Sequence, residues 1–189
     1  SVLSSISKLY NSEQVKKINE VIHANFLESG DSPADGAIKT SQVKFIRMHP
    51  IQGLLGPFID FCHSTNNEYF GFDLLTLTSS KILNYNTYNI DEEYSWHIDA
   101  DVKSPISDIK LTCLLNLSEE KYVGGELFLF RDKEVKIEKF DPGSAVVFPS
   151  FMNHRVSKII SGKRATLAIW MRGPKSVSYT HLTLPTKST

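Results

Sequence analysis

The sequence contains little cysteine, and its charges of opposite sign balance. Cys62 and Cys113 are the two cysteines among 189 residues, too few and too widely separated for a disulfide-stabilised scaffold or a Cys-x-x-Cys metal site. Reduced thiols in the cytoplasm are the simplest interpretation. The 21 Lys and Arg residues match the 21 Asp and Glu residues, so no overall field attracts nucleic acid or an anionic membrane. We expect neither as a partner.

Long apolar runs are also absent. No stretch approaches the roughly 18 apolar residues that a membrane helix needs, and the first 25 residues lack the apolar core of a signal peptide. We therefore expect a soluble protein that is not exported. The composition of 41% hydrophobic, 11% aromatic and 22% charged residues is typical of globular proteins and is sufficient for one sizeable core.

The end of the chain differs from the rest. Residues 176–189 change abruptly to Thr, Ser and Leu, and residues 177–182 resemble the translation of an adapter used in sequencing libraries. We interpret 176–189 as a non-native tail, with a native tail as the alternative. His181 is therefore excluded from the candidate ligands.

Residues 1–175 are expected to form a single domain, with helical support over about 1–68 and a β core over about 69–174. In the support, Asn11 is a favourable N-cap residue, and apolar residues then recur at helical spacing. The predicted elements of the support are a helix over 12–27, a strand over 43–48 and a helix over about 57–64.

The β core is predicted from short β-like runs that are separated by turn signals such as Gly124-Gly125 and Pro142-Gly143. Such runs, after a helical third, predict a mainly β fold with N-terminal helices, and a jelly roll is the leading geometry. The predicted strands are 69–78, 81–88, 94–99, 110–116, 126–131, 134–140, 145–148, 154–160 and 165–171.

A candidate metal site begins with His97 and Asp99. Alternate side chains of a strand share a face, so these two point the same way, and Trp96 and Ile98 are expected to pack on the other face. His154, on a distant strand, is the natural third ligand. Two histidines and one carboxylate on one face of an ion form the arrangement of non-haem Fe(II) oxygenases.

The joint pattern resembles the Fe(II)/2-oxoglutarate-dependent dioxygenase superfamily, in its prolyl-4-hydroxylase-like branch, over roughly 70–174. The family's fold is a double-stranded β-helix, which is a jelly roll. The matching residues, in order, are Tyr88, Tyr94, His97 and Asp99; Leu111 to Leu117; Gly124-Gly-Glu-Leu-Phe128; Pro142 to Phe148; His154; and Gly162-x-Arg164 through Trp170.

The resemblance implies an enzyme that hydroxylates a C–H bond with Fe(II), 2-oxoglutarate and O2, with ascorbate as a candidate reductant, and releases succinate and CO2. It assigns His97, Asp99 and His154 as iron ligands. It assigns Arg164 to the distal carboxylate of 2-oxoglutarate, which suits a guanidinium fork. Tyr88 matches a tyrosine of the cosubstrate pocket, although a core role is an equal alternative.

The face on which Arg164 lies is a test of this assignment. A simple two-residue hairpin at Ser161-Gly162 would place Arg164 on the opposite face from His154. A connection that crosses between the two sheets of a jelly roll would avoid this, and a three-residue connection would also restore the parity. We therefore predict that His154 and Arg164 both face the interior.

The remaining singled-out residues favour structural roles. Cys113 is predicted to be a core residue, Trp96 and Trp170 are predicted to be packing anchors, and His23, His49 and His63 have no paired ligand at useful spacing.

The substrate stays open between a prolyl or other amino-acid residue of a peptide or protein and a small molecule, and the sequence does not predict an oligomeric state. Two other interpretations remain. One is a cupin-like metalloenzyme that uses the same three ligands without 2-oxoglutarate, and the other is a catalytically silent jelly-roll binding module.

Overall fold

The computed structural model describes residues 3–28, 39–100 and 108–174. The predicted tail, 176–189, lies outside these residues. The described elements are the strands β1 (Ser5–Lys8), β2 (Gln42–Arg47), β3 (Ile82–Tyr88), β4 (Tyr94–His97), β5 (Ile109–Asn116), β6 (Val123–Gly124), β7 (Leu127–Arg131), β8 (Lys133–Lys136), β9 (Ser144–Pro149), β10 (Asn153–Val156), β11 (Ile159–Ser161) and β12 (Arg164–Arg172), the helices α1 (Ser12–His23) and α2 (Gly56–Thr65), and the shorter helical segments η1 (His49–Leu54) and η2 (Asn66–Phe70).

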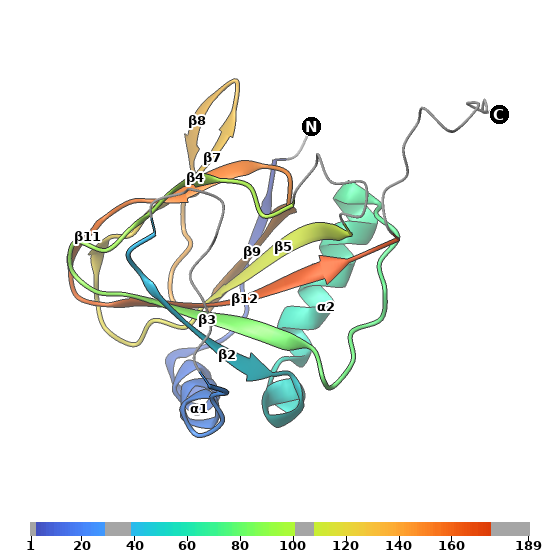
Figure 1. Ribbon diagram of the computed structural model, residues 1–189, viewed down its shortest axis with the longest axis horizontal. Helices are drawn as coiled ribbons and strands as arrows, with labels where there is room; N and C mark the ends of the chain where they lie inside the picture. The colour runs from blue at the N-terminus through green and yellow to red at the C-terminus, as the bar shows by residue number, and fades with distance from the viewer. Residues whose placement is uncertain (1–2, 29–38, 101–107, 175–189) are drawn as a thin grey trace.

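Two antiparallel sheets face each other (Figure 1). The major sheet has the strand order β1-β9-β5-β12-β3-β2, and the minor sheet has the order β4-β10-β7-β8. A two-stranded ribbon of β11 and β6 joins their ends on one side. This arrangement confirms the predicted jelly roll with N-terminal helices.

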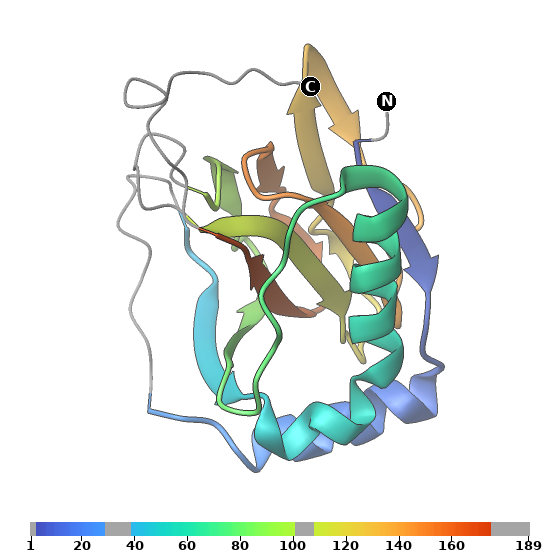
Figure 2. The same ribbon diagram turned by 90° about the vertical axis from the view of Figure 1, so that its right-hand side faces the viewer.

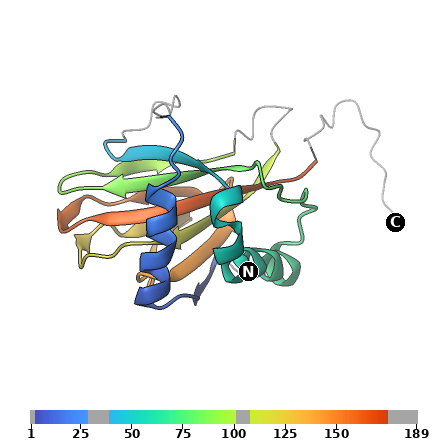
Figure 3. The same ribbon diagram turned by 90° about the horizontal axis from the view of Figure 1, so that it is seen from below.

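The helices α1 and α2 cover the outer face of the major sheet (Figure 3). Residues of β12 alternate between two environments. Leu167 and Ile169 pack beneath the helices, whereas Arg164, Thr166 and Ala168 face the space between the sheets. The helix-side core also contains Ile18, Ile22, Phe58, Cys62, Leu83, Leu111, Cys113, Leu115, Val147 and Met171.

The helix α1 begins at a capping box. The Asn11 side chain accepts a hydrogen bond from the backbone N–H of Gln14, and the Gln14 side chain accepts one from the backbone N–H of Asn11. The helix ends at His23 rather than at the predicted residue 27. Phe26 nevertheless reaches the core from the following turn, which explains why its spacing extended the helical pattern.

The predicted strand 69–78 is wrong. A π-helical turn occupies Asn66–Phe70, and Gly71 ends it in the left-handed region at φ 67°. No strand follows among the described residues until β3. Phe72, Leu74 and Leu77 still contact the helix-side core, so these apolar residues reflect one-sided packing of an irregular segment rather than strand pairing.

Two smaller differences concern strands. The predicted strand 154–160 is divided into β10 and β11, which belong to different sheets. The strand β1 was not predicted; it pairs with β9, with Ser5 opposite Val147. Short edge strands of this kind carry little periodicity of their own.

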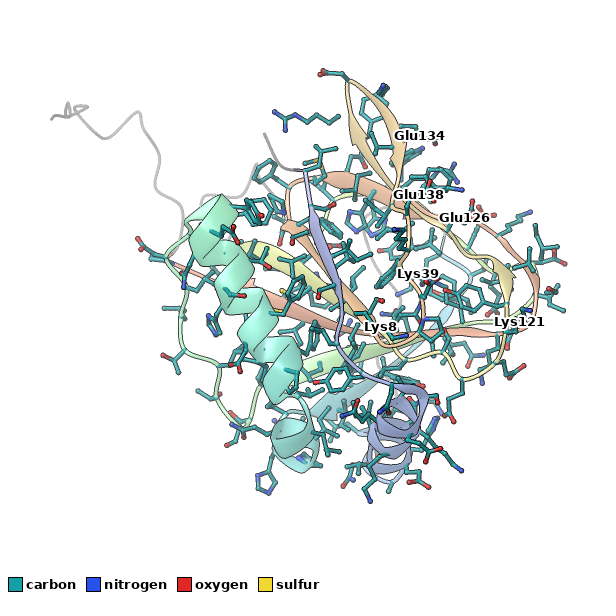
Figure 4. The ribbon with its side chains drawn as sticks, turned by 180° about the vertical axis from the view of Figure 1, so that it is seen from behind. Lys8, Lys39, Lys121, Glu126, Glu134 and Glu138 are labelled. Carbon is teal, nitrogen blue, oxygen red and sulfur yellow. The ribbon has the colours of Figure 1, made fainter. Side chains whose placement is uncertain are left out.

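The β7–β8 hairpin projects from the body of the molecule (Figure 2). Figure 4 shows that Glu126, Glu134 and Glu138 lie on or beside this hairpin. Lys136 contacts Glu126 at 3.4 Å and Glu138 at 3.9 Å, so these two acidic residues have a cation beside them.

Within the described part of the chain, no helix combines the length and the apolar character that crossing a membrane requires.

Candidate metal site

Three side chains from two neighbouring strands converge at one point. His97 ends β4, Asp99 follows two residues later, and His154 on β10 lies directly opposite His97 in the antiparallel register. Asp99 Oδ1 lies 3.4 Å from His97 Nε2, and Asp99 Oδ2 lies 3.2 Å from His154 Nε2. All three ligand atoms lie within 4.8 Å of one another, a spacing at which they could hold one metal ion.

Backbone carbonyls fix the orientation of both imidazoles. The Nδ1 atom of His97 lies 2.7 Å from the Ser95 carbonyl oxygen, and Nδ1 of His154 lies 2.8 Å from the Met152 carbonyl oxygen. A hydrogen on each Nδ1 therefore donates to a carbonyl, which leaves the lone pair of Nε2 for a metal. Tyr94 stacks on the His97 ring at 3.6 Å between centroids.

Asp99 is held by contacts with the major sheet, at β5 and at the residue that follows β9. The Thr112 hydroxyl donates to Asp99 Oδ2 at 2.7 Å, and the backbone N–H of Asp99 donates to the Ser150 carbonyl at 3.1 Å. Ligand-orienting contacts of this kind reduce the freedom that a metal would otherwise have to restrict.

The three side chains are almost completely buried, with 5% of each histidine and 9% of Asp99 exposed. Burial alone would raise the pKa of Asp99, but the adjacent imidazoles of His154 and His97 outweigh it and hold that pKa well below its usual range. Burial lowers the pKa of His154, but the Asp99 carboxylate outweighs it, so that this pKa is raised. A cation at this point would take the place of the proton that the Asp99 carboxylate favours on His154.

A cavity of about 240 Å³ extends from these three side chains between the sheets. Arg164 and Tyr88 line the same cavity and lie opposite each other in the β12–β3 register. The connection from β10 in the minor sheet to β12 in the major sheet runs through β11. The prediction that His154 and Arg164 both face the interior is confirmed.

Arg164 has unsatisfied hydrogen-bonding capacity. Arg164 is 1% exposed, yet its Nε, Nη1 and Nη2 atoms have no hydrogen-bond partner within the described ranges. Its Cζ atom lies 5.1 Å from the centroid of the Tyr88 ring, and burial raises the pKa of the Tyr88 hydroxyl while Arg164 opposes the rise. A buried guanidinium without partners is costly, and a ligand carboxylate would satisfy it bidentately.

This donor set fits Fe(II) and 2-oxoglutarate. Two imidazole nitrogens and a carboxylate suit Fe(II) and leave coordination positions open. Arg164 faces the same cavity with unpaired donors, which suits the second carboxylate of a short dicarboxylate.

Several residues that line the cavity were not predicted to do so. Asn84, Asn86, Thr166 and Trp170 line the cavity, and the buried Nε1 of Trp170 has no hydrogen-bond partner among the described residues. Trp170 was predicted only to be a packing anchor. The signal was the alternation of β12, because residues 166, 168 and 170 share the face of Arg164.

The prediction for the other face of β4 was partly wrong. Ile98 is 36% exposed rather than packed. Trp96 packs in part, with its ring edge-on to Phe130 at 5.9 Å and the Arg155 guanidinium 5.4 Å from its centroid. Among the described residues, no helix covers this face of the minor sheet (Figure 1), which explains the exposure. Cys113 is fully buried, as predicted.

Fold and site together define a jelly-roll protein with a two-histidine, one-carboxylate metal-binding arrangement. Residues 82–172 match the model of the 2OG-Fe(II) oxygenase superfamily. Over these residues the chain is similar to this superfamily, and the relatives and solved structures described next include PKHD-type hydroxylases and prolyl-4-hydroxylases.

The curated relatives are hydroxylases. A PKHD-type hydroxylase of Shewanella frigidimarina is 36% identical over 95 residues, which are 47% of this chain and 42% of that relative. A PKHD-type hydroxylase of Synechococcus sp. is 34% identical over 86 residues, which are 42% of this chain and 36% of that relative. The matches therefore span less than half the length of these relatives.

Solved structures share the fold over nearly the whole chain. A Pseudomonas putida prolyl-4-hydroxylase superimposes with a TM-score of 0.68 at 19% identity, covering 90% of this chain and 92% of that one. The viral collagen prolyl hydroxylase of Paramecium Bursaria Chlorella virus-1, in complex with 2OG, gives 0.66 at 12% identity and covers 92% and 97%. Both support the double-stranded β-helix.

Proposed function

We propose that this protein is an Fe(II)- and 2-oxoglutarate-dependent dioxygenase that hydroxylates a C–H bond. The observation that carries the proposal is the buried, unpaired guanidinium of Arg164, which lines the same cavity as His97, Asp99 and His154. A metal ligand set alone would also suit a cupin-like enzyme, whereas an inward-facing arginine without a partner calls for an anionic ligand beside the metal.

In this proposal His97, Asp99 and His154 hold the iron, and Arg164 binds the distal carboxylate of 2-oxoglutarate beside Tyr88. When bound, iron and 2-oxoglutarate supply the oxidising chemistry that uses O2 to hydroxylate the substrate, with release of succinate and CO2. The protein orients the ligands through Ser95, Met152 and Thr112 and excludes bulk water by burying the site.

The proposed substrate is a prolyl or other amino-acid residue of a peptide or protein, with a small molecule as the alternative. The names of the prolyl-4-hydroxylase and PKHD-type relatives support the first. We further propose ascorbate as the reductant and the cytoplasm as the compartment. We also propose that residues 1–175 form one functional domain, because the helices of the support pack against the β core.

Anaerobic titration of the protein with Fe(II) and then 2-oxoglutarate tests the proposal. Chelation should produce a weak visible charge-transfer absorption in the wild type and in His49→Ala, which replaces an exposed histidine outside the site. His154→Ala should lose it. Metal binding without any response to 2-oxoglutarate would contradict the proposal and favour the cupin-like enzyme, and no metal binding would favour the silent binding module.

A further inference from the structure

The side chain of Arg164 crosses a narrow passage before its guanidinium reaches the cavity. A Cβ atom placed on Gly125 would lie 2.8 Å from Arg164 Cδ and 2.3 Å from Ile159 Cδ1. Beyond this point, Arg164 Cζ lies 5.1 Å from the ring centroid of Tyr88 and 5.8 Å from that of Phe140. Arg164 is 1% exposed and Ile159 is fully buried, and the free space beside Arg164 is the cavity itself, so a displaced Arg164 side chain would move within the space that the ligand needs.

The backbone at Gly125 is also fixed. Gly124 pairs with Ile159 in the β6–β11 ribbon, and the Gly125 N–H donates to the Lys158 carbonyl at 3.2 Å. A Cβ on Gly124 would lie only 2.2 Å from that same carbonyl oxygen. The backbone of residues 124–125 therefore lies in contact with the backbone of residues 158–159, with no side chain between them. Residue 125 cannot move away from Arg164 without breaking the ribbon.

Gly125 takes no direct part in the cavity that contains the metal ligands. It lines a separate hollow of about 430 Å³ together with Tyr122 and Phe140. Of the side chains that a Cβ on Gly125 would meet, Arg164 is the one that lines the first cavity.

We propose that Gly125 is a positioning residue for the cosubstrate: its lack of a Cβ permits the one conformation of Arg164 that aims the guanidinium into the cavity. This inference rests on the proposed function, in which Arg164 binds the distal carboxylate. A side chain at residue 125 displaces Cδ and with it the guanidinium, while the three metal ligands stay in place. Preorganised geometry of this kind is sensitive to displacements of about 1 Å.

The test must separate this collision from the backbone strain of replacing a glycine. Gly125 has φ 60°, a left-handed conformation that any other residue adopts with strain. Gly71 has φ 67°, and a Cβ there would meet nothing within 4 Å, so Gly71→Ala introduces the same strain without a collision. Ile159→Val removes Cδ1, so the double variant Gly125→Ala/Ile159→Val retains only the collision with Arg164.

The experiment measures anaerobic binding of Fe(II), and then of 2-oxoglutarate, by visible absorption and by the ligand-induced shift of the thermal midpoint. Gly71→Ala and Ile159→Val should match the wild type. In Gly125→Ala and in the double variant, affinity for 2-oxoglutarate should fall by about 10-fold to 100-fold. Affinity for Fe(II) should stay unchanged, which a general loss of structure would not allow.

Wild-type affinity for 2-oxoglutarate in the double variant would overturn the inference. If Gly125→Ala fails to bind Fe(II) as well, the same change is made in Arg164→Ala, which lacks Cδ. Restored Fe(II) binding supports the collision with Arg164, and continued loss shows that Gly125 serves the fold alone. Absence of any response to 2-oxoglutarate in the wild type would reject the proposed function first, and this inference with it.

Discussion

Arg164 is the residue at which stability and ligand binding are most clearly opposed. Its guanidinium is buried among Tyr88 and Phe140, and cation–π contacts of this kind contribute about 0.5–2 kcal/mol. The desolvation of an ion costs several kcal/mol when no hydrogen bonds replace its hydration. The cost therefore exceeds the gain until an anion binds.

Replacement of this cation by an apolar side chain of similar length should stabilise the ligand-free protein. We expect Arg164→Met to raise the free energy of unfolding by about 1–3 kcal/mol and to abolish the stabilisation that 2-oxoglutarate gives the wild type. Urea denaturation with and without 2-oxoglutarate measures both effects. Arg172→Met, which removes an exposed arginine paired with Asp108, should retain the ligand effect; a destabilised Arg164→Met protein would contradict the argument.

The Asp99–His154 pair predicts how the metal-free protein responds to pH. The pKa of Asp99 is lowered in the folded state, so its contribution to stability is present above the unfolded value of about 3.9 and is lost as pH falls. The pKa of His154 is raised, so its contribution is present below about 6.5 and is lost as pH rises through the folded value. Stability from this pair should therefore be greatest between these limits.

Thermal midpoints measured across pH in the presence of a chelator test this expectation. Asp99→Asn should reverse the slope on the alkaline side, because burial then lowers the pKa of His154, so that stability rises with pH up to about 6.5. A profile of Asp99→Asn with the same shape as that of the wild type would show that other groups determine the pH dependence.

At the scale of elements, the N-terminus of α1 offers a test of stability that leaves the site untouched. Asn11→Ala removes the side-chain acceptor of the Gln14 N–H, a 2.8 Å hydrogen bond, and should lower the free energy of unfolding by about 1 kcal/mol. Asn11→Ser should restore most of it. Equilibrium unfolding in urea gives these differences, and affinity for 2-oxoglutarate should not change in either variant.

The elements also show which parts of the site a sequence can predict. His97 and Asp99 lie two residues apart, at the end of β4 and in the bend that follows, and the period of a strand predicts their common face. The position of Arg164 depended on which sheet each strand joins, since β10 and β12 pair in different sheets. Local periodicity does not contain that information, and the crossing between sheets that a jelly roll supplies is what places Arg164 toward the interior.

The same limit explains the wrong element. Residues 72–77 are rich in apolar side chains, as a strand often is, but Phe72, Leu74 and Leu77 contact the helix-side core without strand pairing. A pattern of burial predicts which residues point inward, whereas strand formation also needs a neighbouring strand with free backbone groups. Gly71 in the left-handed region directs this segment away from such pairing.

At the scale of the whole molecule, the two thiols report on opening of the core. Cys62 and Cys113 are both fully buried beneath the major sheet, and burial raises the pKa of the Cys62 thiol well above its ordinary value. We expect neither to react with a thiol reagent in the native protein. The rate of labelling should be set either by the rate of unfolding or by the equilibrium population of the unfolded state. Rapid labelling of the native state would show a looser core.

The strand order of the major sheet has a consequence for synthesis of the protein. The strand β12 lies between β5 and β3, yet it leaves the ribosome after all the other strands described. Until it emerges, β3 and β5 have no partner on that side, and β1 must also wait for β9. The nascent chain therefore exposes open sheet edges over most of its translation, so that early chaperone association, rather than stepwise cotranslational folding, should govern its yield in cells.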